Sequence, residues 1–454
     1  MAATFPTRTA GLRMPLMAQL RARVWPVGAD ADRSFLHASA IYFASNVLSA
    51  AIPFVLLPVL TRHLSPSEYG EAAMFQTLVW GAGALVGLGT AGAVSRKYFD
   101  KGTTDDVLRQ FVASCLQILL ASGAFFFLLA ILLKDRISGW LGLDAAWVPW
   151  AVVVAILAVP VQLRLGQWEM RRKPHQYGAM QNSQSLLNIT LSLFLVVVLL
   201  KGADGRVMAQ IVTTGTIGAA ALLLLHRDRL LSIASWRPGY IREALAFGVP
   251  MVPHLLASFA MAAADRLLVA KELGLEEAGV YMVAVQIAAA LLMVFDAAAR
   301  SFTPWLFEQL SAGDAAAHRN VVRRTYMVLG FMLAAGLAMV AAGPTFVELV
   351  AGTRYRRAGE VIGWLAMGQV FFGMYLVFNA FIVYQRRTGT LSSITIASGA
   401  VGIVLLVLGI RILGLHGAAI AFCTTMALRA AWTWWAAQKC QPMPWLGSQD
   451  KNHV

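Results

Sequence analysis

Residues 416–437 read HGAAIAFCTTMALRAAWTWWAA, an apolar stretch in which Arg429 is the one permanently charged side chain. A helix needs about 20 apolar residues of this kind to cross the ~30 Å hydrocarbon core of a bilayer. Comparable stretches recur along nearly the whole chain, which is 58% hydrophobic and 13% charged, whereas a soluble domain carries about 25% charged residues. The pattern therefore predicts an all-α polytopic membrane protein with about twelve transmembrane helices.

The loops between these stretches are short. The longest loop, at about 300–324, is too small to hold a soluble catalytic domain, so we expect function to reside within or between the helices. The predicted spans are 35–60, 72–95, 110–133, 146–166, 180–200, 207–225, 243–269, 278–299, 325–343, 361–384, 390–410 and 416–437.

The positive charges are distributed unevenly between the two sides of the membrane. If the N-terminus is cytoplasmic, 25 of the 37 Lys and Arg residues lie in cytoplasmic segments and 11 on the opposite side. This bias predicts that both termini are cytoplasmic. It also accounts for the net charge of +14 without nucleic acid as a partner. Residues 1–34 are expected to be a basic cytoplasmic tail lying on anionic lipid, although their composition also fits a transit peptide.

A polar stretch, HRDRLLSIASWRPGY at 226–240, separates six predicted spans from six. We expect a cytoplasmic linker at 226–242 between an N-lobe at 35–225 and a C-lobe at 243–437, with a cytoplasmic tail at 438–454. Because each half has an even number of spans, both halves enter the membrane in the same direction. Pseudo-symmetric lobes of this kind are related by an axis along the membrane normal.

A faint internal repeat supports the two halves. The first predicted span of the N-lobe ends in LTRHLSPSEYG at 60–70, and that of the C-lobe ends in VAKELGLEEAG at 269–279. At a constant offset, four pairs agree: Arg62/Lys271, Leu64/Leu273, Glu68/Glu277 and Gly70/Gly279.

Both of these first spans contain a pair of prolines, Pro53 and Pro58 in one and Pro250 and Pro253 in the other. Proline removes a backbone donor and kinks a helix, and within a membrane the freed carbonyl needs a protein or water partner. Broken segments at corresponding places of two halves indicate a transport site. The alternative is that the prolines only shape two helices.

Several motifs resemble those of the bacterial polysaccharide flippases, the O-antigen and exopolysaccharide exporters of the multidrug/oligosaccharidyl-lipid/polysaccharide superfamily. They are LTRHLSPSEYG after the first span, FGVPMVPH at 247–254, the pair Asp265-Arg266, and AGVYMVAVQIA at 278–288. The resemblance covers roughly 35–437. It implies two six-helix lobes around a central V-shaped cavity with a cationic lining.

The resemblance also implies a function. An undecaprenyl-diphosphate-linked oligosaccharide would move from the inner to the outer leaflet of the bacterial inner membrane by alternating access, for the biosynthesis of lipopolysaccharide or exopolysaccharide. The expected partners would be membrane lipid together with a glycan polymerase and export machinery. No cofactor or metal is expected, and coupling to protons or sodium is left open.

A diphosphate needs a polar and cationic path because an isolated charge is costly in hydrocarbon, and the planar fork of arginine binds phosphate through two hydrogen bonds. The candidate substrate-binding residues are charged or polar side chains within predicted spans or at their mouths. They are Arg429, Arg300, Arg266, Asn46, His254 and Arg62. Asp265 is the candidate for ion coupling, because a carboxylate in a medium of low dielectric exchanges protons more readily.

Each candidate also has a structural interpretation. Arg429 could extend toward the membrane interface past the nearby tryptophans, and Arg300 could pair with Asp296 one helical turn earlier. Asp265 could be the partner of an arginine in another span. Asn46 and His254 could form hydrogen bonds between helices, and Arg62 could only anchor the outer interface.

Two other classes of function compete with a flippase. An ion-coupled drug or metabolite antiporter of the same superfamily predicts a cavity with more carboxylates than arginines. A membrane-embedded glycan polymerase or acyltransferase predicts a catalytic His or carboxylate beside a large external loop. A scaffold without transport activity is a third alternative. The spacing of the polar residues matches no known catalytic motif, so we expect a transporter and not an enzyme.

Overall fold

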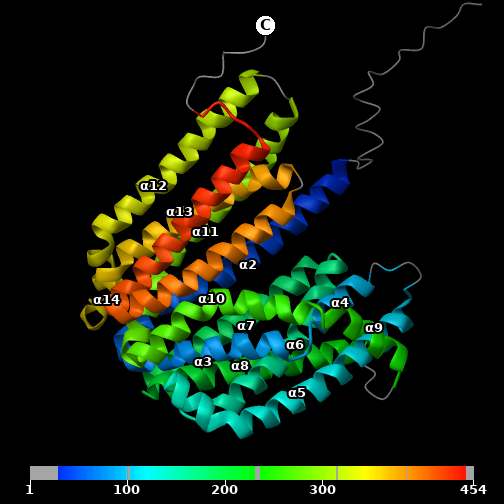
Figure 1. The fold of residues 1–454 in the computed structure, drawn as a ribbon. Helices are drawn as coiled ribbons and strands as arrows, with labels where there is room; N and C mark the ends of the chain where they lie inside the picture. The colour runs from blue at the N-terminus through cyan, green and yellow to red at the C-terminus, as the bar shows by residue number, and fades with distance from the viewer. Residues whose placement is uncertain are drawn as a thin grey trace, which may run out of the picture.

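The structure is a computed structural model that describes residues 29–98, 100, 103–230, 236–312, 315–385 and 387–445. Every regular element in these ranges is a helix (Figure 1). The helices are α2 (Ala29–His63), α3 (Pro66–Leu85), α4 (Thr90–Lys97), α5 (Asp105–Leu141), α6 (Trp147–Met170), α7 (Pro174–Leu193) with the π-helical turn η1 (Phe194–Val198), α8 (Gly202–Arg227), α9 (Pro238–Gly248), α10 (Met251–Leu273), α11 (Leu275–Ala312), α12 (Ala315–Ala351), the short 3₁₀ helix η2 (Thr353–Tyr355), α13 (Ala358–Tyr384) and α14 (Thr388–Cys440).

Ten of the described helices are long and apolar enough to cross a membrane, or eleven when the bent pair α3 and α4 counts as one span. The predicted all-α polytopic fold is confirmed. Most of the predicted basic tail at 1–34 lies outside the described residues, which begin within α2. The division into lobes at 226–242 and the cytoplasmic position of both termini stay predictions.

The two last predicted spans lie in one element, α14. Gly414 in its middle has φ 59° and ψ −131°, a backbone conformation that is essentially restricted to glycine. The backbones of Gly409 and Gly417 touch, so that a methyl group on either would overlap the other. The chain therefore reverses at Gly414, and α14 is a hairpin of two spans, as 390–410 and 416–437 predict.

Two other spans are interrupted. The chain bends by 52° between α3 and α4, where Gly87 and Gly89 take positive φ values. The predicted break in the first span of the C-lobe is present, since α9 ends at Gly248 and α10 begins at Met251. The predicted break in the N-lobe is wrong, because Pro53 and Pro58 lie inside a continuous α2. The two interruptions meet: a methyl group on Gly248 would overlap the carbonyl oxygen of Leu88.

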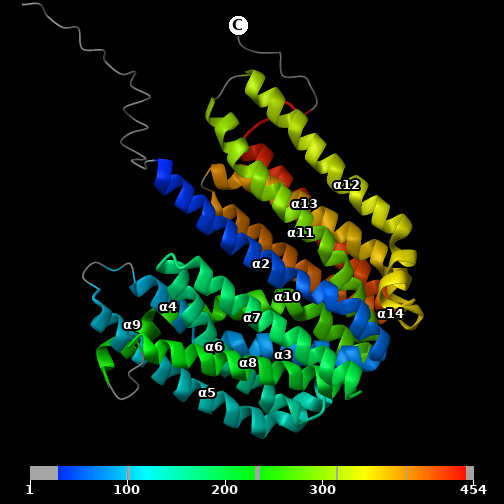
Figure 2. The same ribbon diagram turned by 180° about the vertical axis from the view of Figure 1, so that it is seen from behind.

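The helices form two groups. In one, α6 packs on α3, α5 and α8, and α2 packs on α7; in the other, α13 packs on α11, α12 and α14. Helix α10 lies between the groups in Figures 1 and 2, in contact with α3 on one side and α11 and α14 on the other. Helix α9 packs on α4 and α5, so this part of the predicted C-lobe lies against the N-lobe.

The groups meet where α3 crosses α11. A methyl group on Gly70 would overlap the carbonyl oxygen of Leu275, and one on Gly279 would overlap that of Pro66. Pro66 and Leu275 stand at the same offset as Gly70 and Gly279, so the contact maps onto itself when the halves are exchanged. The repeat seen in the sequence is therefore a pseudo-twofold contact between two backbones. Small residues permit this approach between membrane helices.

Local sequence sets the start of α3 at this contact. Ser65 and Glu68 form a capping box, in which the Ser65 amide donates to Glu68 Oε2 (2.8 Å) and the Glu68 amide donates to Ser65 Oγ (3.3 Å). Pro66 occupies the first helical turn, where its missing N–H has no partner to lose. The capped turn holds Gly70 at the crossing with α11.

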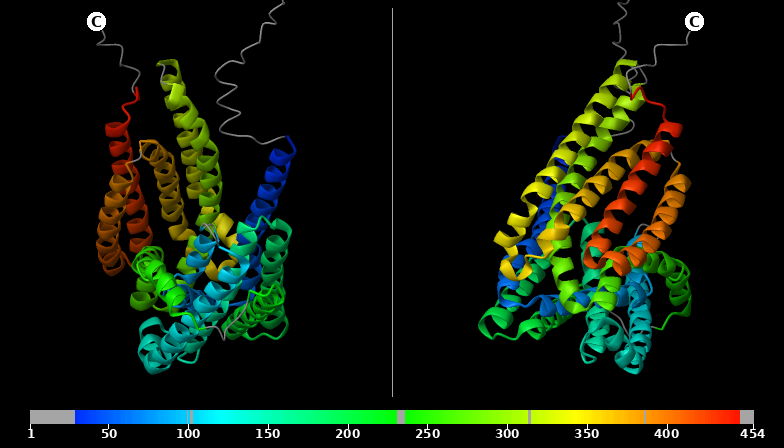
Figure 3. Two further views of the ribbon diagram at one scale, coloured as in Figure 1. Left: turned by 90° about the vertical axis from the view of Figure 1, so that its right-hand side faces the viewer. Right: turned by 60° about the vertical axis from the view of Figure 1, so that its left-hand side comes forward.

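We call this region the outer end, because the predicted topology places the turns from α2 to α3 and from α10 to α11 outside. Tyr69 Oη donates to Gln286 Oε1 (2.7 Å), and Tyr355 Oη donates to the Leu64 carbonyl (3.1 Å). Burial raises the pKa of Tyr355, so its hydroxyl stays protonated and able to donate. One buried apolar cluster here contains residues of both halves, among them Leu57 and Tyr281. At the opposite end, α2 and α11–α14 spread apart (Figure 3).

We expect Gly70→Val and Gly279→Val each to destabilise the protein by about 1–3 kcal/mol, because an added side chain forces the two backbones apart. Gly330→Val is the matched control, since no atom lies within 4 Å of a Cβ at that position in α12. Thermal unfolding of the purified protein in detergent measures the difference. An equal fall in Tm for the control would show that valine acts through helix propensity rather than through the crossing.

Candidate functional site

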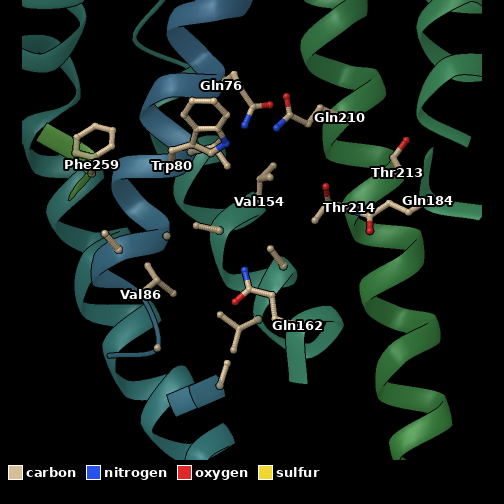
Figure 4. Close-up of a pocket in the computed structure, with 18 of the residues that line it drawn as sticks. Gln76, Trp80, Val86, Val154, Gln162, Gln184, Gln210, Thr213, Thr214 and Phe259 are labelled. Carbon is tan, nitrogen blue, oxygen red and sulfur yellow. The ribbon is translucent and has the colours of Figure 1, made fainter. Parts of the chain in front are cut away.

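A cavity of about 860 Å³ lies against α2, α3, α6, α7, α8 and α10. We call it the amide cavity, because amide side chains dominate its polar lining. Figure 4 shows Gln76 of α3 and Gln210 of α8 pointing toward one another across it. Its polar lining residues are Ser49, Gln76, Thr90, Gln162, Gln181, Gln184, Ser185, Asn188, Arg206, Gln210, Thr213 and Thr214.

Helical spacing brings these side chains to one side of each helix. On α7 the polar residues Gln181, Gln184 and Asn188 follow at intervals of three and four, which places them on one face. Arg206 and Gln210 on α8 are likewise separated by four residues. Helices α7 and α8 therefore turn polar side chains toward the same space.

Arg206 stands at the start of α8 and is held by α7. Its Nη1 donates to Asn188 Oδ1 (2.9 Å) and to Ser192 Oγ (2.8 Å). Both acceptors are neutral, and within the described ranges Arg206 forms no ion pair. Its positive charge is thus oriented but not compensated. A cation removed from water and left unpaired favours an anionic ligand.

A second cavity of about 400 Å³ continues from the first toward the outer end. We call it the apex cavity. It shares Gln76, Trp80 and Arg206 with the amide cavity and adds Arg266 of α10. The guanidinium of Arg266 lies 5.3 Å from the centre of the Trp80 ring, and its buried Nε has no hydrogen-bond partner in the described part of the chain. Arg206 and Arg266 therefore reach one space from the two halves.

A third cavity of about 290 Å³ lies within the second group of helices and shares Arg266 with the apex cavity. Its lining is mostly apolar, and its polar residues are Asp265, Arg266, Gln369 and Thr425. Asp265 accepts from Tyr281 Oη (3.0 Å) and from the Arg266 amide (2.8 Å). The structure thus places a hydroxyl, and not an arginine side chain, against this carboxylate.

Arg429 lies between α13 and α14, outside the lining of these three cavities. Its guanidinium sits 4.0 Å from the centre of the Tyr375 ring, and Nη2 donates to Thr395 Oγ1 (3.2 Å). The side chain is half-buried and its Nε has no partner among the described residues. Arg429 is therefore held by aromatic and hydroxyl groups within the second group of helices.

The other candidates lie apart. The Arg300 side chain is 79% exposed and pairs with Asp296 (2.6 Å). This ion pair is the structural role that the sequence offered as the alternative to substrate binding. Asn46 Oδ1 accepts from Tyr177 Oη (3.1 Å), a bond between α2 and α7. His254 on α10 and Arg62 at the outer end of α2 are exposed. Of the seven predicted site residues, the structure brings Arg266 and Asp265 to the described cavities.

Sequence reasoning missed Arg206 and the glutamines. Arg206 precedes its predicted span by one residue, so it was counted as a loop charge. A usable signal was present in the regular spacing of Gln181, Gln184 and Asn188 within a predicted membrane span. Amides at helical intervals inside a membrane span point to a polar partner on one face.

Comparisons with known proteins agree with this fold. The chain is 25% identical over 284 residues to a protein named "Uncharacterized membrane protein" from Haemophilus influenzae, with 62% of this chain and 67% of the relative covered. It is 21% identical over 284 residues to "Lsg locus putative protein 1" of the same organism, with 60% and 66% covered. The match thus spans about two thirds of each relative's length.

Two solved structures share the fold. One is a multidrug resistance MATE family transporter of the MOP superfamily in an inward-facing conformation, with TM-score 0.67 and 14% identity over 86% of this chain and 94% of that chain. The other is the lipid II flippase MurJ in an inward closed conformation, with TM-score 0.65 and 10% identity over 88% and 87%.

A sequence model of the family described as "Polysaccharide biosynthesis protein" matches residues 35–310, more than half of the chain. This range includes α3, α8 and α10, which carry the amides and both arginines of the apex. The resemblance found in the motifs is confirmed, together with a transporter fold. The chain belongs to the polysaccharide biosynthesis protein family.

Proposed function

We propose that the protein moves an undecaprenyl-diphosphate-linked oligosaccharide from the inner to the outer leaflet of the bacterial inner membrane. The observation that carries the proposal is the pair of arginines at the apex cavity, neither of which forms an ion pair within the described residues. The family concerns polysaccharide biosynthesis, and one protein of the same fold is named as a lipid II flippase.

The energetics of the task support this pairing of site and substrate. A polyprenyl chain needs no aqueous path, since each CH₂ favours the apolar phase by about 0.8 kcal/mol. The diphosphate does need one, because a bare anion is expelled from hydrocarbon. Two guanidinium groups from opposite halves offer bidentate hydrogen bonds and balancing charge. A neutral sugar chain would be accommodated by the amides beside them.

The closed outer end supports alternating access. At this end the crossing of α3 and α11 brings backbone against backbone, while helices spread apart at the other end (Figure 3). A site between two halves that touch at one end can be exposed to the other side by rocking the halves. Opening the crossing would release the head group outward.

The cavity lining favours a flippase over a drug antiporter. No carboxylate lines the amide cavity or the apex cavity within the described residues, and Asp265 lines only the smaller third cavity. A site for cationic drugs calls for the opposite balance of charge. Asp265 nevertheless keeps ion coupling as part of the proposal, because its carboxylate adjoins Arg266 at the edge of the apex.

Arg206→Gln and Arg266→Gln are each expected to lower translocation of a fluorescent undecaprenyl-diphosphate oligosaccharide in reconstituted vesicles by about tenfold or more. The loss of one hydrogen bond to a charged group is worth about 1.5–3 kcal/mol. Arg136→Gln, an exposed position on α5, is the control. Wild-type rates in both apex variants, at equal protein content, would remove the arginine pair from the mechanism.

The predicted contacts at Arg429 and Arg300 are open to the same assay. Arg429→Ala is expected to reduce translocation, because the cation held over Tyr375 would receive the diphosphate in a later position. Arg300→Ala tests the predicted contact at the mouth against its ion pair with Asp296. Unchanged transport in both variants would confine the diphosphate site to the apex.

Asp265→Asn is expected to abolish any dependence of translocation on an imposed proton or sodium gradient, because the amide cannot ionise. Translocation rates with and without each gradient, in wild type and variant, measure this. A variant that still responds to the gradient as the wild type does would place the coupling group elsewhere.

A further inference from the structure

Five glutamines face the amide cavity without a side-chain hydrogen bond to any described residue. They are Gln76, Gln162, Gln181, Gln184 and Gln210. Each amide offers two N–H donors and a carbonyl acceptor, and leaving these unmet within a membrane protein costs free energy. A cluster of this size, on four different helices, needs a polar occupant.

Helix packing does not explain these glutamines. Other polar side chains of the same bundle bond from helix to helix: Tyr177 bonds to Asn46 (3.1 Å), and Ser49 bonds to Ser185 (3.1 Å) at the wall of the cavity itself. Such bonds are the usual use of polar residues between membrane helices. The five amides instead project into a space of about 860 Å³, near the upper end of the ~300–1,000 Å³ common for ligand sites.

We propose that the amide cavity is a glycan subsite, which takes the uncharged, hydroxyl-rich sugars of the head group while Arg206 and Arg266 hold the diphosphate. This inference rests on the proposed function. A sugar hydroxyl both donates and accepts, as an amide does, so the two form hydrogen bonds without any change of charge. A diphosphate in the same place would face five neutral side chains, which cannot balance its negative charges.

Trp80 marks the boundary between the two subsites. It lines both cavities, its side chain is 49% exposed, and its ring faces the Arg266 guanidinium at 5.3 Å. An aromatic face offers apolar area that the C–H face of a sugar ring can cover. The sugar next to the diphosphate therefore packs on Trp80, and the following sugars extend toward Gln184 and Gln162.

The test compares two labelled lipids in the same vesicles. One is undecaprenyl diphosphate carrying a tetrasaccharide of neutral hexoses, and the other is undecaprenyl diphosphate without sugar. The double variant Gln181→Leu/Gln184→Leu is expected to slow the tetrasaccharide lipid about tenfold, as the loss of two hydrogen bonds implies, and to leave the sugar-free lipid within twofold of wild type. Trp80→Leu, which removes the platform, should act in the same sense, and Trp80→Phe should restore most of the rate.

Gln117→Leu is the matched control, because Gln117 lies in the membrane-spanning helix α5 of the same half but outside the cavity lining. It should leave both lipids at wild-type rates. A wild type that moves only the tetrasaccharide lipid also supports the subsite, provided that the double variant loses this transport.

Two results overturn the inference while the flippase proposal stands. One is a double variant that keeps full transport of the tetrasaccharide lipid, and the other is an equal loss for both lipids. A wild type that moves neither lipid overturns the proposed function itself.

Discussion

The two halves touch at the crossing of α3 and α11, where Gly70 and Gly279 allow backbone to contact backbone. Membrane helices gain little from hydrophobic association, so close packing and hydrogen bonds must hold them together. At this crossing there is room for nothing larger than a hydrogen on either glycine. Tyr69, Tyr355 and the apolar cluster around Leu57 consolidate the same end. The cavities exist because the halves are joined here and separate farther along.

Four of the described arginines differ in the kind of partner that they have. Arg164 is buried against Asp228 and lies over the Trp168 ring, and Arg300 pairs with Asp296. These charges are compensated and serve structure. Arg206 and Arg266 form no ion pair with a described residue: neutral oxygens hold Arg206, and Arg266 lies over Trp80 with Asp265 as its neighbour in the chain. An uncompensated guanidinium in a membrane interior is costly, and its retention at a cavity is most simply explained by an anionic ligand.

The two halves contribute equivalent backbone segments to the crossing, but their cavities are lined by different kinds of residue. The first half surrounds a large cavity with amides, whereas the second surrounds a small cavity with a mostly apolar lining. A symmetric crossing is compatible with the rocking of two lobes that we propose. The difference between the two cavity linings suits a substrate with chemically distinct parts, because each part needs surroundings of matching polarity. Trp80 and Arg266 stand where the two environments meet.

Much of the architecture could be predicted from the sequence. Hydrophobic length determines where a helix can cross a bilayer, and the repeat at 60–70 and 269–279 was visible in the sequence, although only the structure shows that its glycines meet. The break at Pro250 could be predicted for the same kind of local reason, since proline lacks a donor. The expected break in α2 was wrong, because Pro53 and Pro58 are accommodated within a helix that packing keeps continuous.

Most residues of the functional site could not be predicted from the sequence. Whether an arginine is paired, exposed or directed into a cavity depends on side chains that are distant in the chain, as Asn188 and Trp80 are for Arg206 and Arg266. Arg429 stood out in the sequence as a charge within a span, yet the tertiary structure placed it over Tyr375. Sequence alone determined the membrane fold and the repeat at 60–70 and 269–279, because these follow from local hydropathy and residue pattern. Only the tertiary structure decided which polar groups converge, because convergence is set by how the helices pack.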